Sequence, residues 1–86
     1  MKGVKSLSDI EVGKIAEVCR LAATGSIRRR FLDIGLVSGT RVECIGKSPA
    51  GDPSAYLIRG AVIAIRREDA AGILVIPKEE DENGTY

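Results

Sequence analysis

Apolar residues recur at every second position in several short stretches, which is the period of a half-buried β-strand. The strand-like stretches are 13–19 (GKIAEVC), 40–48 (TRVECIGKS), 54–59 (SAYLIR), 61–66 (AVIAIR) and 73–76 (ILVI). Pro77 is expected to end the last of them, because proline has no N–H to donate to a neighbouring strand. The stretch 61–66 is largely apolar on both faces, which favours a strand packed inside a closed barrel.

The stretch 24–36 (TGSIRRRFLDIGL) has helical spacing instead, with three apolar residues on one face: Ile27, Phe31 and Ile34. Thr24 or Ser26 is placed to cap the start of this helix. Gly35 is placed to adopt a left-handed conformation after its end, so that Leu36 folds back onto Phe31. A second helical turn is expected at 67–72 (REDAAG), where Gly72 ends it.

These elements predict the fold class. Five short strands, one helix after the first strand and a single turn before the last leave no room for the β-α-β units of a parallel sheet. The predicted fold is therefore mainly β: a small SH3-like barrel of about five antiparallel strands with a short helical insertion after the first strand. Closure of such a sheet removes the exposed edges that invite aggregation.

Length and charge place the boundaries of this domain. The chain has 86 residues, which suits one domain at 1–77, with 13 basic and 12 acidic residues overall. The acidic stretch 78–86 (KEEDENGTY) has no aliphatic side chain to bury and is expected to be disordered. No signal peptide or membrane-spanning run is recognisable, so a cytoplasmic location is expected. Cys19 and Cys44 are then expected to be buried, reduced thiols.

Several kinds of chemistry find no support. The chain contains no histidine, the commonest general base and metal ligand, and its carboxylates show no ligand spacing, so neither catalysis nor a metal or cofactor site is predicted. Gly46-Lys47-Ser48 resembles the end of a phosphate-binding loop, but Pro49 follows where that loop needs a helix. Arg28, Arg29 and Arg30 fan around their helix, and aromatic residues for base stacking are almost absent, so no nucleic-acid partner is predicted. The residues describe a non-catalytic module that contacts a partner through its loops.

The order of the motifs resembles the ferrous iron transport protein A (FeoA) family. The pattern runs from an arginine-rich helix through the segment around Gly35 and Gly39 to the loop Ser48-Pro49-Ala50-Gly51-Asp52-Pro53, a glycine turn, and a strand ending in Ile65-Arg66. The likeness covers about residues 7–76. Ser38 stands where the family often has proline, and Ala50 where it usually has leucine. If that leucine contacts a partner, this chain binds more weakly or elsewhere.

The resemblance implies a bacterial cytosolic accessory protein that binds the membrane transporter FeoB at its cytosolic GTPase region and modulates ferrous iron uptake, without catalysis. The candidate partner-binding residues are Leu36, Pro49, Ala50, Gly51, Asp52 and Pro53. The loop at 48–54 is expected to form a turn first, with Asp52 bonded to its own backbone. Two alternatives stay open: a protein that carries Fe(II) directly, and an SH3-like interaction module of the kind that closes some iron-dependent repressors.

Overall fold

The computed structural model describes residues 3–78, in which the chain folds into six antiparallel strands with two α-helices and one 3₁₀ turn. The elements in chain order are β1 (Lys5–Ser6), η1 (Leu7–Asp9), β2 (Ile15–Leu21), α1 (Gly25–Asp33), β3 (Arg41–Lys47), β4 (Ser54–Ile58), β5 (Ala61–Ile65), α2 (Arg67–Ala70) and β6 (Ile73–Lys78). The fold is mainly β with a helix after the first long strand, as the sequence predicts.

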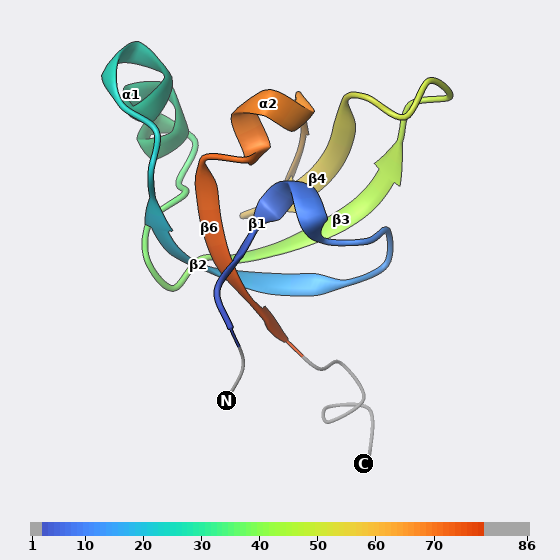
Figure 1. Cartoon of the computed structure of the whole chain (residues 1–86), viewed down its shortest axis with the longest axis horizontal. Helices are drawn as coiled ribbons and strands as arrows, with labels where there is room; N and C mark the ends of the chain where they lie inside the picture. Colours follow the sequence, from blue (N-terminus) through green and yellow to red (C-terminus); the bar gives the residue numbers. More distant parts are fainter. Residues whose placement is uncertain (1–2, 79–86) are drawn as a thin grey trace.

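All six strands belong to one sheet, in the order β1-β6-β2-β3-β4-β5. The register shifts at two places, between Val18 and Arg20 on β2 and between Cys44 and Gly46 on β3. An extra residue on one strand bends it and increases its twist, so these bulges help the sheet to curl around a core. Figure 1 shows the result: β2 and β3 form a long curved floor, while α1, α2 and the loop between β3 and β4 stand along one side of the molecule.

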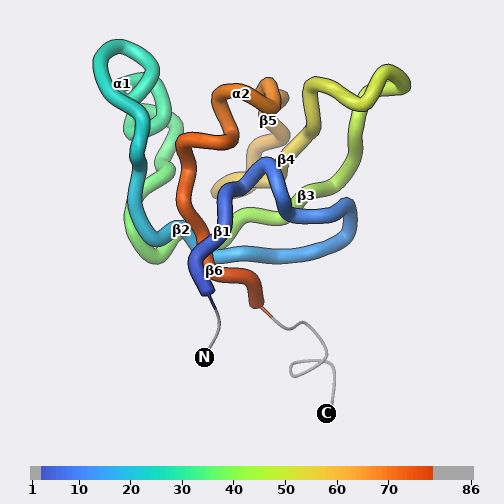
Figure 2. Tube along the Cα trace, viewed as in Figure 1, coloured from blue at the N-terminus to red at the C-terminus, as the bar shows by residue number. Residues whose placement is uncertain are grey.

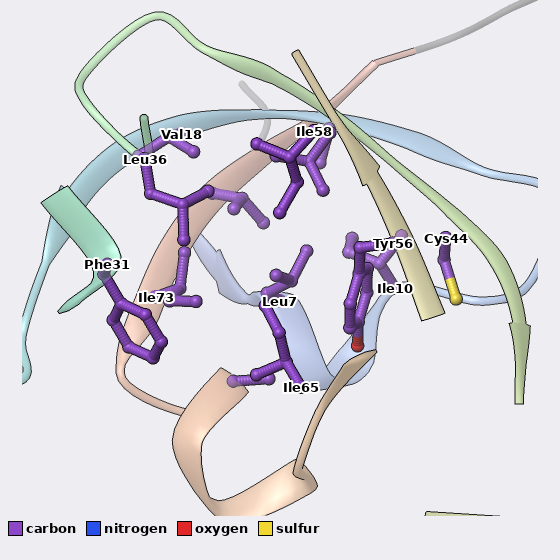
Figure 3. Close-up of a cluster of buried hydrophobic side chains, with 14 residues drawn as sticks. Leu7, Ile10, Val18, Phe31, Leu36, Cys44, Tyr56, Ile58, Ile65 and Ile73 are labelled. Carbon is purple, nitrogen blue, oxygen red and sulfur yellow. The ribbon is translucent and has the colours of Figure 1, made fainter. Parts of the chain in front are cut away.

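The core lies inside the curled sheet and under η1. Its buried apolar side chains are Leu7, Ile10, Ala16, Val18, Phe31, Leu36, Val42, Cys44, Tyr56, Ile58, Ile65, Ala70, Ile73 and Val75. In Figure 3 Leu7 lies near the centre of this cluster, between Ile73 and Tyr56. The 3₁₀ turn therefore places one leucine where the sheet alone would leave its middle unfilled. Cys44 is buried beside Tyr56, its partner on β4, whereas Cys19 sits in the β2 bulge and is only half-buried.

Tyr56 makes stability depend on pH in the alkaline range. Its side chain is 2% exposed, and burial raises the pKa of its phenol above the ordinary value of 10.0, partly offset by a hydrogen bond with Ser54. A pKa that is higher in the folded chain stabilises the fold fully below pH 10, and that contribution is lost as the pH rises through the folded value. We expect the free energy of unfolding to fall above about pH 10, and Tyr56→Phe to reduce this fall. Urea unfolding of both proteins between pH 8 and 11 measures the difference.

The helix α1 ends as the sequence predicts. Gly35 has φ = 98°, its N–H donates to the carbonyl of Leu32 (3.0 Å), and the N–H of Leu36 donates to the carbonyl of Phe31 (3.0 Å). These two bonds form a Schellman motif, which satisfies carbonyls that the end of a helix would leave unpaired. Leu36 and Phe31 are both buried, and Figure 3 shows both side chains pointing into the core beside Ile73. At the other end Thr24 occupies the cap position, but its side chain makes no capping bond.

Two expectations about the strands are wrong. The short β1 was not predicted, and it pairs with Leu74 and Val75 of β6. The last strand does not end at Pro77, which pairs with Ala16. Because β1 covers β6 only at its start, no strand within residues 3–78 pairs with the other side of β6 at Pro77, and the missing N–H leaves no described strand partner unbonded.

The expectation of a closed barrel is also wrong at β5. Within residues 3–78 this strand pairs only with β4, so the curled sheet has an open edge there. Ile65 is buried and Ile63 packs against the core, but Val62 on the other face is 63% exposed. Apolar composition on both faces of a strand does not by itself show that both faces are covered. The predicted acidic tail lies outside the described residues, apart from Lys78.

Candidate protein-interaction site

The loop between β3 and β4 is a turn closed by two backbone bonds. The N–H of Gly51 donates to the carbonyl of Ser48 (2.8 Å), and the N–H of Ser48 donates to the carbonyl of Pro53 (3.0 Å). Gly51 has φ = 91°, a left-handed value that glycine adopts without strain. Pro49, Ala50, Gly51 and Asp52 are exposed and Pro53 is half-buried. The loop therefore presents an exposed tip on a fixed base, and Figure 2 shows it projecting from the end of β3.

Asp52 has a structural role that the sequence did not indicate. Its Oδ1 accepts a hydrogen bond from the backbone N–H of Arg67 (2.8 Å), the first residue of α2. Arg66, at the N-cap position of α2, provides no side-chain capping bond, so Asp52 caps this helix from a different segment of the chain. The expectation that Asp52 bonds its own backbone is replaced by this longer-range contact, which ties the loop to α2.

Removal of this cap is expected to lower stability. Asp52→Ala leaves the N–H of Arg67 without its acceptor, and we expect the free energy of unfolding to fall by about 0.5–2 kcal/mol. Asp52→Asn retains an oxygen acceptor, so its free energy of unfolding should fall clearly less. Chemical denaturation of the three proteins tests this expectation, and equal stabilities for all three would show that the bond contributes nothing. A binding defect of Asp52→Ala would accordingly have two causes, so another loop residue is the better test of binding.

An open groove of about 530 Å³ begins at Pro53 and separates α1 from β5. Its lining residues are Arg30, Phe31, Ile34, Pro53, Ile63, Ala64, Ile65, Arg66 and Asp69. Aliphatic and aromatic side chains form its walls, and the charged groups are Arg30 from α1, Arg66 at the start of α2, and Asp69 within α2. A hollow of this size with apolar walls and a few charged groups is typical of a binding site.

The structure separates the predicted partner-binding residues into two groups. Pro49, Ala50, Gly51, Asp52 and Pro53 are together in the loop, and Pro53 joins that loop to the groove. Leu36 does not belong with them: it is 0% exposed and forms part of the core. Its side chain is not available to a partner in this fold, because it closes the end of α1 against Phe31.

Sequence reasoning missed the groove. Ile34 and Phe31 were interpreted only as one apolar face of the helix, and Arg30 was considered only as a possible contact to nucleic acid. One signal was available: the stretch 61–66 combines apolar residues on both faces with a terminal arginine, Arg66, which is unusual for a strand exposed to solvent. Which residues approach one another across the groove depends on how α1 lies beside β5, and no local pattern encodes that.

Two other properties bear on the site. Among residues 3–78, no three histidine, cysteine, aspartate or glutamate side chains gather in a way that could hold a metal ion. In the same part of the chain, no helix is long and apolar enough to cross a membrane.

Comparison with known proteins assigns this chain to a family. The FeoA domain family matches residues 5–77. A curated relative, the Fe(2+) transport protein A/Fe(2+) transporter FeoB fusion protein of Porphyromonas gingivalis, is 36% identical over 69 residues, which is 80% of this chain. The chain spans only 8% of the length of that relative.

Two solved structures have the same fold. The FeoA protein of Chlorobium tepidum is 36% identical with a TM-score of 0.81, and the match covers 86% of this chain and 70% of that one. The FeoA of Stenotrophomonas maltophilia, solved with zinc and described as a prokaryotic SH3 domain protein, is 27% identical with a TM-score of 0.74, covering 81% of this chain and 87% of that one. The SH3-like fold class predicted from the sequence is confirmed. With nearly all of the described domain matched, this chain belongs to the FeoA family of ferrous iron transport proteins.

Proposed function

We propose that this chain is a non-catalytic accessory protein of ferrous iron uptake that binds the transporter FeoB at its cytosolic GTPase region and modulates transport. The observation that carries the proposal is the Porphyromonas gingivalis relative, in which an FeoA-like region and FeoB are parts of one polypeptide. Fusion keeps two modules at a high effective concentration. In this protein the same association would form through the surface of the FeoA-like domain, on the cytoplasmic side of the membrane.

The loop tip supplies one part of that surface. Ala50 is exposed at the outermost turn of a loop whose base is held by the two backbone bonds and by the cap on α2. Binding residues are often carried on loops that a rigid scaffold positions, because little conformational freedom is then lost on association. The same reasoning extends to the groove, since Pro53 belongs to both.

Substitution of Ala50 tests the loop without disturbing its structural bonds. Ala50→Leu adds apolar area at the tip, and we expect it to tighten binding to the cytosolic domain of FeoB by about fivefold, equivalent to roughly 1 kcal/mol. Ala50→Asp should weaken binding by a similar factor. Val12→Asp, which makes the same kind of change at an exposed turn elsewhere, is the control. Isothermal titration calorimetry measures all four proteins; equal affinities across the set would remove the loop tip from the interface.

The two alternative functions, an Fe(II) carrier and a repressor-type module, can be distinguished by the ligand that each would bind. A chain that carries Fe(II) should show discrete NMR shifts at stoichiometric Fe(II) or Co(II). A repressor-type module that contacts DNA should bind it with an affinity that falls as salt rises. Transporter binding is placed ahead of both because it is consistent with the fusion relative, in which an FeoA-like region and FeoB belong to one polypeptide.

A further inference from the structure

β5 has one free edge with regularly spaced backbone groups. The turn Arg59-Gly60 connects β4 to β5, and both of its residues have positive φ, the geometry of a two-residue type I′ hairpin. The residues flanking such a turn, Ile58 and Ala61, exchange both of their hydrogen bonds, and the next pair along does not. By this alternation, the N–H and C=O groups of Val62 and Ala64 point away from β4. No other strand within residues 3–78 pairs with them.

Within residues 3–78, this edge lacks the usual protection against pairing with another strand. Exposed edges in natural proteins are commonly blunted by lysine, proline, a bulge or very short length. β5 has five uncharged residues in unbroken register with β4, and Val62 on it is 63% exposed. The opposite edge of the same sheet is different, because β1 has only two residues and one of them is Lys5. The contrast indicates that β5 is an edge that accepts a partner.

The groove lies alongside this edge and provides room for an added strand. Ile63, Ala64 and Ile65 of β5 form one wall, and Phe31 and Ile34 of α1 lie across from them. An extended segment placed there would bond to Val62 and Ala64 through its backbone. Alternate side chains of the same segment would face the apolar wall. Backbone bonds supply affinity in this mode of recognition, and the side-chain contacts supply specificity.

The charges around the groove indicate which segment fits. Within residues 3–78, the charged residues that line it are Arg30, Arg66 and Asp69. At the turn end of β5, Arg59 packs against Gly35, and its Cδ occupies the space that a Cβ at Gly35 would take. Two arginines against one aspartate in the lining, with Arg59 at the turn end of β5, favour an occupant with carboxylates. A second copy of β5 would bring its own Arg59 and Arg66 into the same space, and like charges oppose that pairing.

We propose that β5 accepts an extended, acidic segment of a partner protein as a further strand of the sheet. Its backbone bonds to Val62 and Ala64, its small apolar side chains face Ile34 and Ile63, and a carboxylate lies near Arg66. This proposal takes one thing from the proposed function: the identity of the partner protein as FeoB. The binding mode itself is a property of this chain and is testable without FeoB.

The first experiment uses two synthetic peptides of about eight residues, a length suited to a single added strand. Both alternate valine and threonine; one has glutamate at each end and the other has lysine. In a ¹⁵N NMR titration, the glutamate peptide is expected to shift the amide signals of Val62 and Ala64 and to slow their hydrogen exchange. We expect it to bind at least about fivefold more tightly than the lysine peptide. Equal affinity of the two peptides, or shifts confined to other residues, would overturn the proposal.

Two variants with matched controls separate the backbone from the charges. Ala64→Pro removes an N–H that points away from β4. This change should lower the affinity for the glutamate peptide about tenfold. Ala64→Thr retains that N–H and should bind like the parent chain. Arg66→Glu should lower the affinity for the glutamate peptide about tenfold. Arg28→Glu makes the same charge change on α1 outside the groove and should leave that affinity nearly unchanged. Circular dichroism and the melting temperature establish that each variant is folded. Equal binding by Ala64→Pro and Ala64→Thr would contradict a strand-addition mode.

The cytosolic domain of FeoB forms the second arm. If it binds the parent chain and the Ala64→Pro variant equally, the proposed function stands and strand addition is overturned. If it binds neither, but the glutamate peptide shows the expected pattern, strand addition stands and the assignment of FeoB as the partner fails. Sedimentation of the chain alone tests self-association. A dimer that Ala64→Pro dissociates would show that the edge pairs with its own copy, contrary to the charge argument.

Discussion

Truncation of Leu36 to alanine is expected to lower the free energy of unfolding by about 2–5 kcal/mol. The side chain is 0% exposed and packs with Phe31 in the core, so its removal loses apolar burial and leaves a cavity. A small domain has only about 5–15 kcal/mol of total stability, and the variant is therefore expected to be partly unfolded at 37 °C. Urea denaturation followed by circular dichroism measures the change.

Leu32→Ala is the matched control for Leu36→Ala. Leu32 lies near the end of α1, but it is 37% exposed. The identical truncation there should lower the free energy of unfolding by less than about 1 kcal/mol. The comparison also tests the predicted role of Leu36 in partner binding. If Leu36→Ala retained full stability and lost only affinity for FeoB, the assignment of this side chain to the core would be wrong.

Gly35→Ala is expected to destabilise the chain by about 1–2 kcal/mol, because a left-handed conformation brings Cβ close to the following carbonyl. Gly35 has φ = 98°, and an added Cβ would also meet the side chain of Arg59, which has to move. Arg59 is exposed, so its displacement should cost less than the backbone strain. Thermal and urea unfolding measure the sum of the two effects.

Gly13→Ala separates the strain from the contact. Gly13 has φ = 92° with nothing within 4 Å of the added Cβ, so alanine there experiences the conformational strain alone. We expect Gly13→Ala to cost slightly less than Gly35→Ala. Introducing Arg59→Gly should bring the cost of Gly35→Ala down to that of Gly13→Ala. An unchanged cost in that background would show that Arg59 moves freely, without a free-energy penalty.

Most of the local structure could be predicted from the sequence. The end of α1 is the clearest example: an apolar spacing that stops at Ile34, followed by Gly35 and Leu36, specifies a Schellman motif, and the observed bonds match it. The turn at Arg59-Gly60 and the single turn of α2 follow in the same way from short-range patterns. The loop at 48–53 was located correctly, but its bond to α2 was not foreseen.

The candidate site was predicted only in part, because its parts meet across long separations in sequence. Asp52 caps a helix that begins 15 residues later, and Pro53 shares a groove with Arg30 and Arg66. Leu36 was placed among the binding residues by its motif, although its apolar character alone fits the core equally well. Exposure depends on which elements cover a side chain, and a pattern within one segment does not contain that information.

By itself, the sequence determined most of the elements of this protein, the mainly β fold class, the family resemblance and the lack of histidine chemistry. These depend on propensities, spacing and composition, all of which act over a few residues or over the chain as a whole. The tertiary structure alone decided that β5 is an open edge, that α1 lies beside it to form a groove, and that Leu36 is core. The physical reason is that burial and strand pairing depend on where the curled sheet ends. The two bulges, together with the packing of η1 and α1, determine where that end lies.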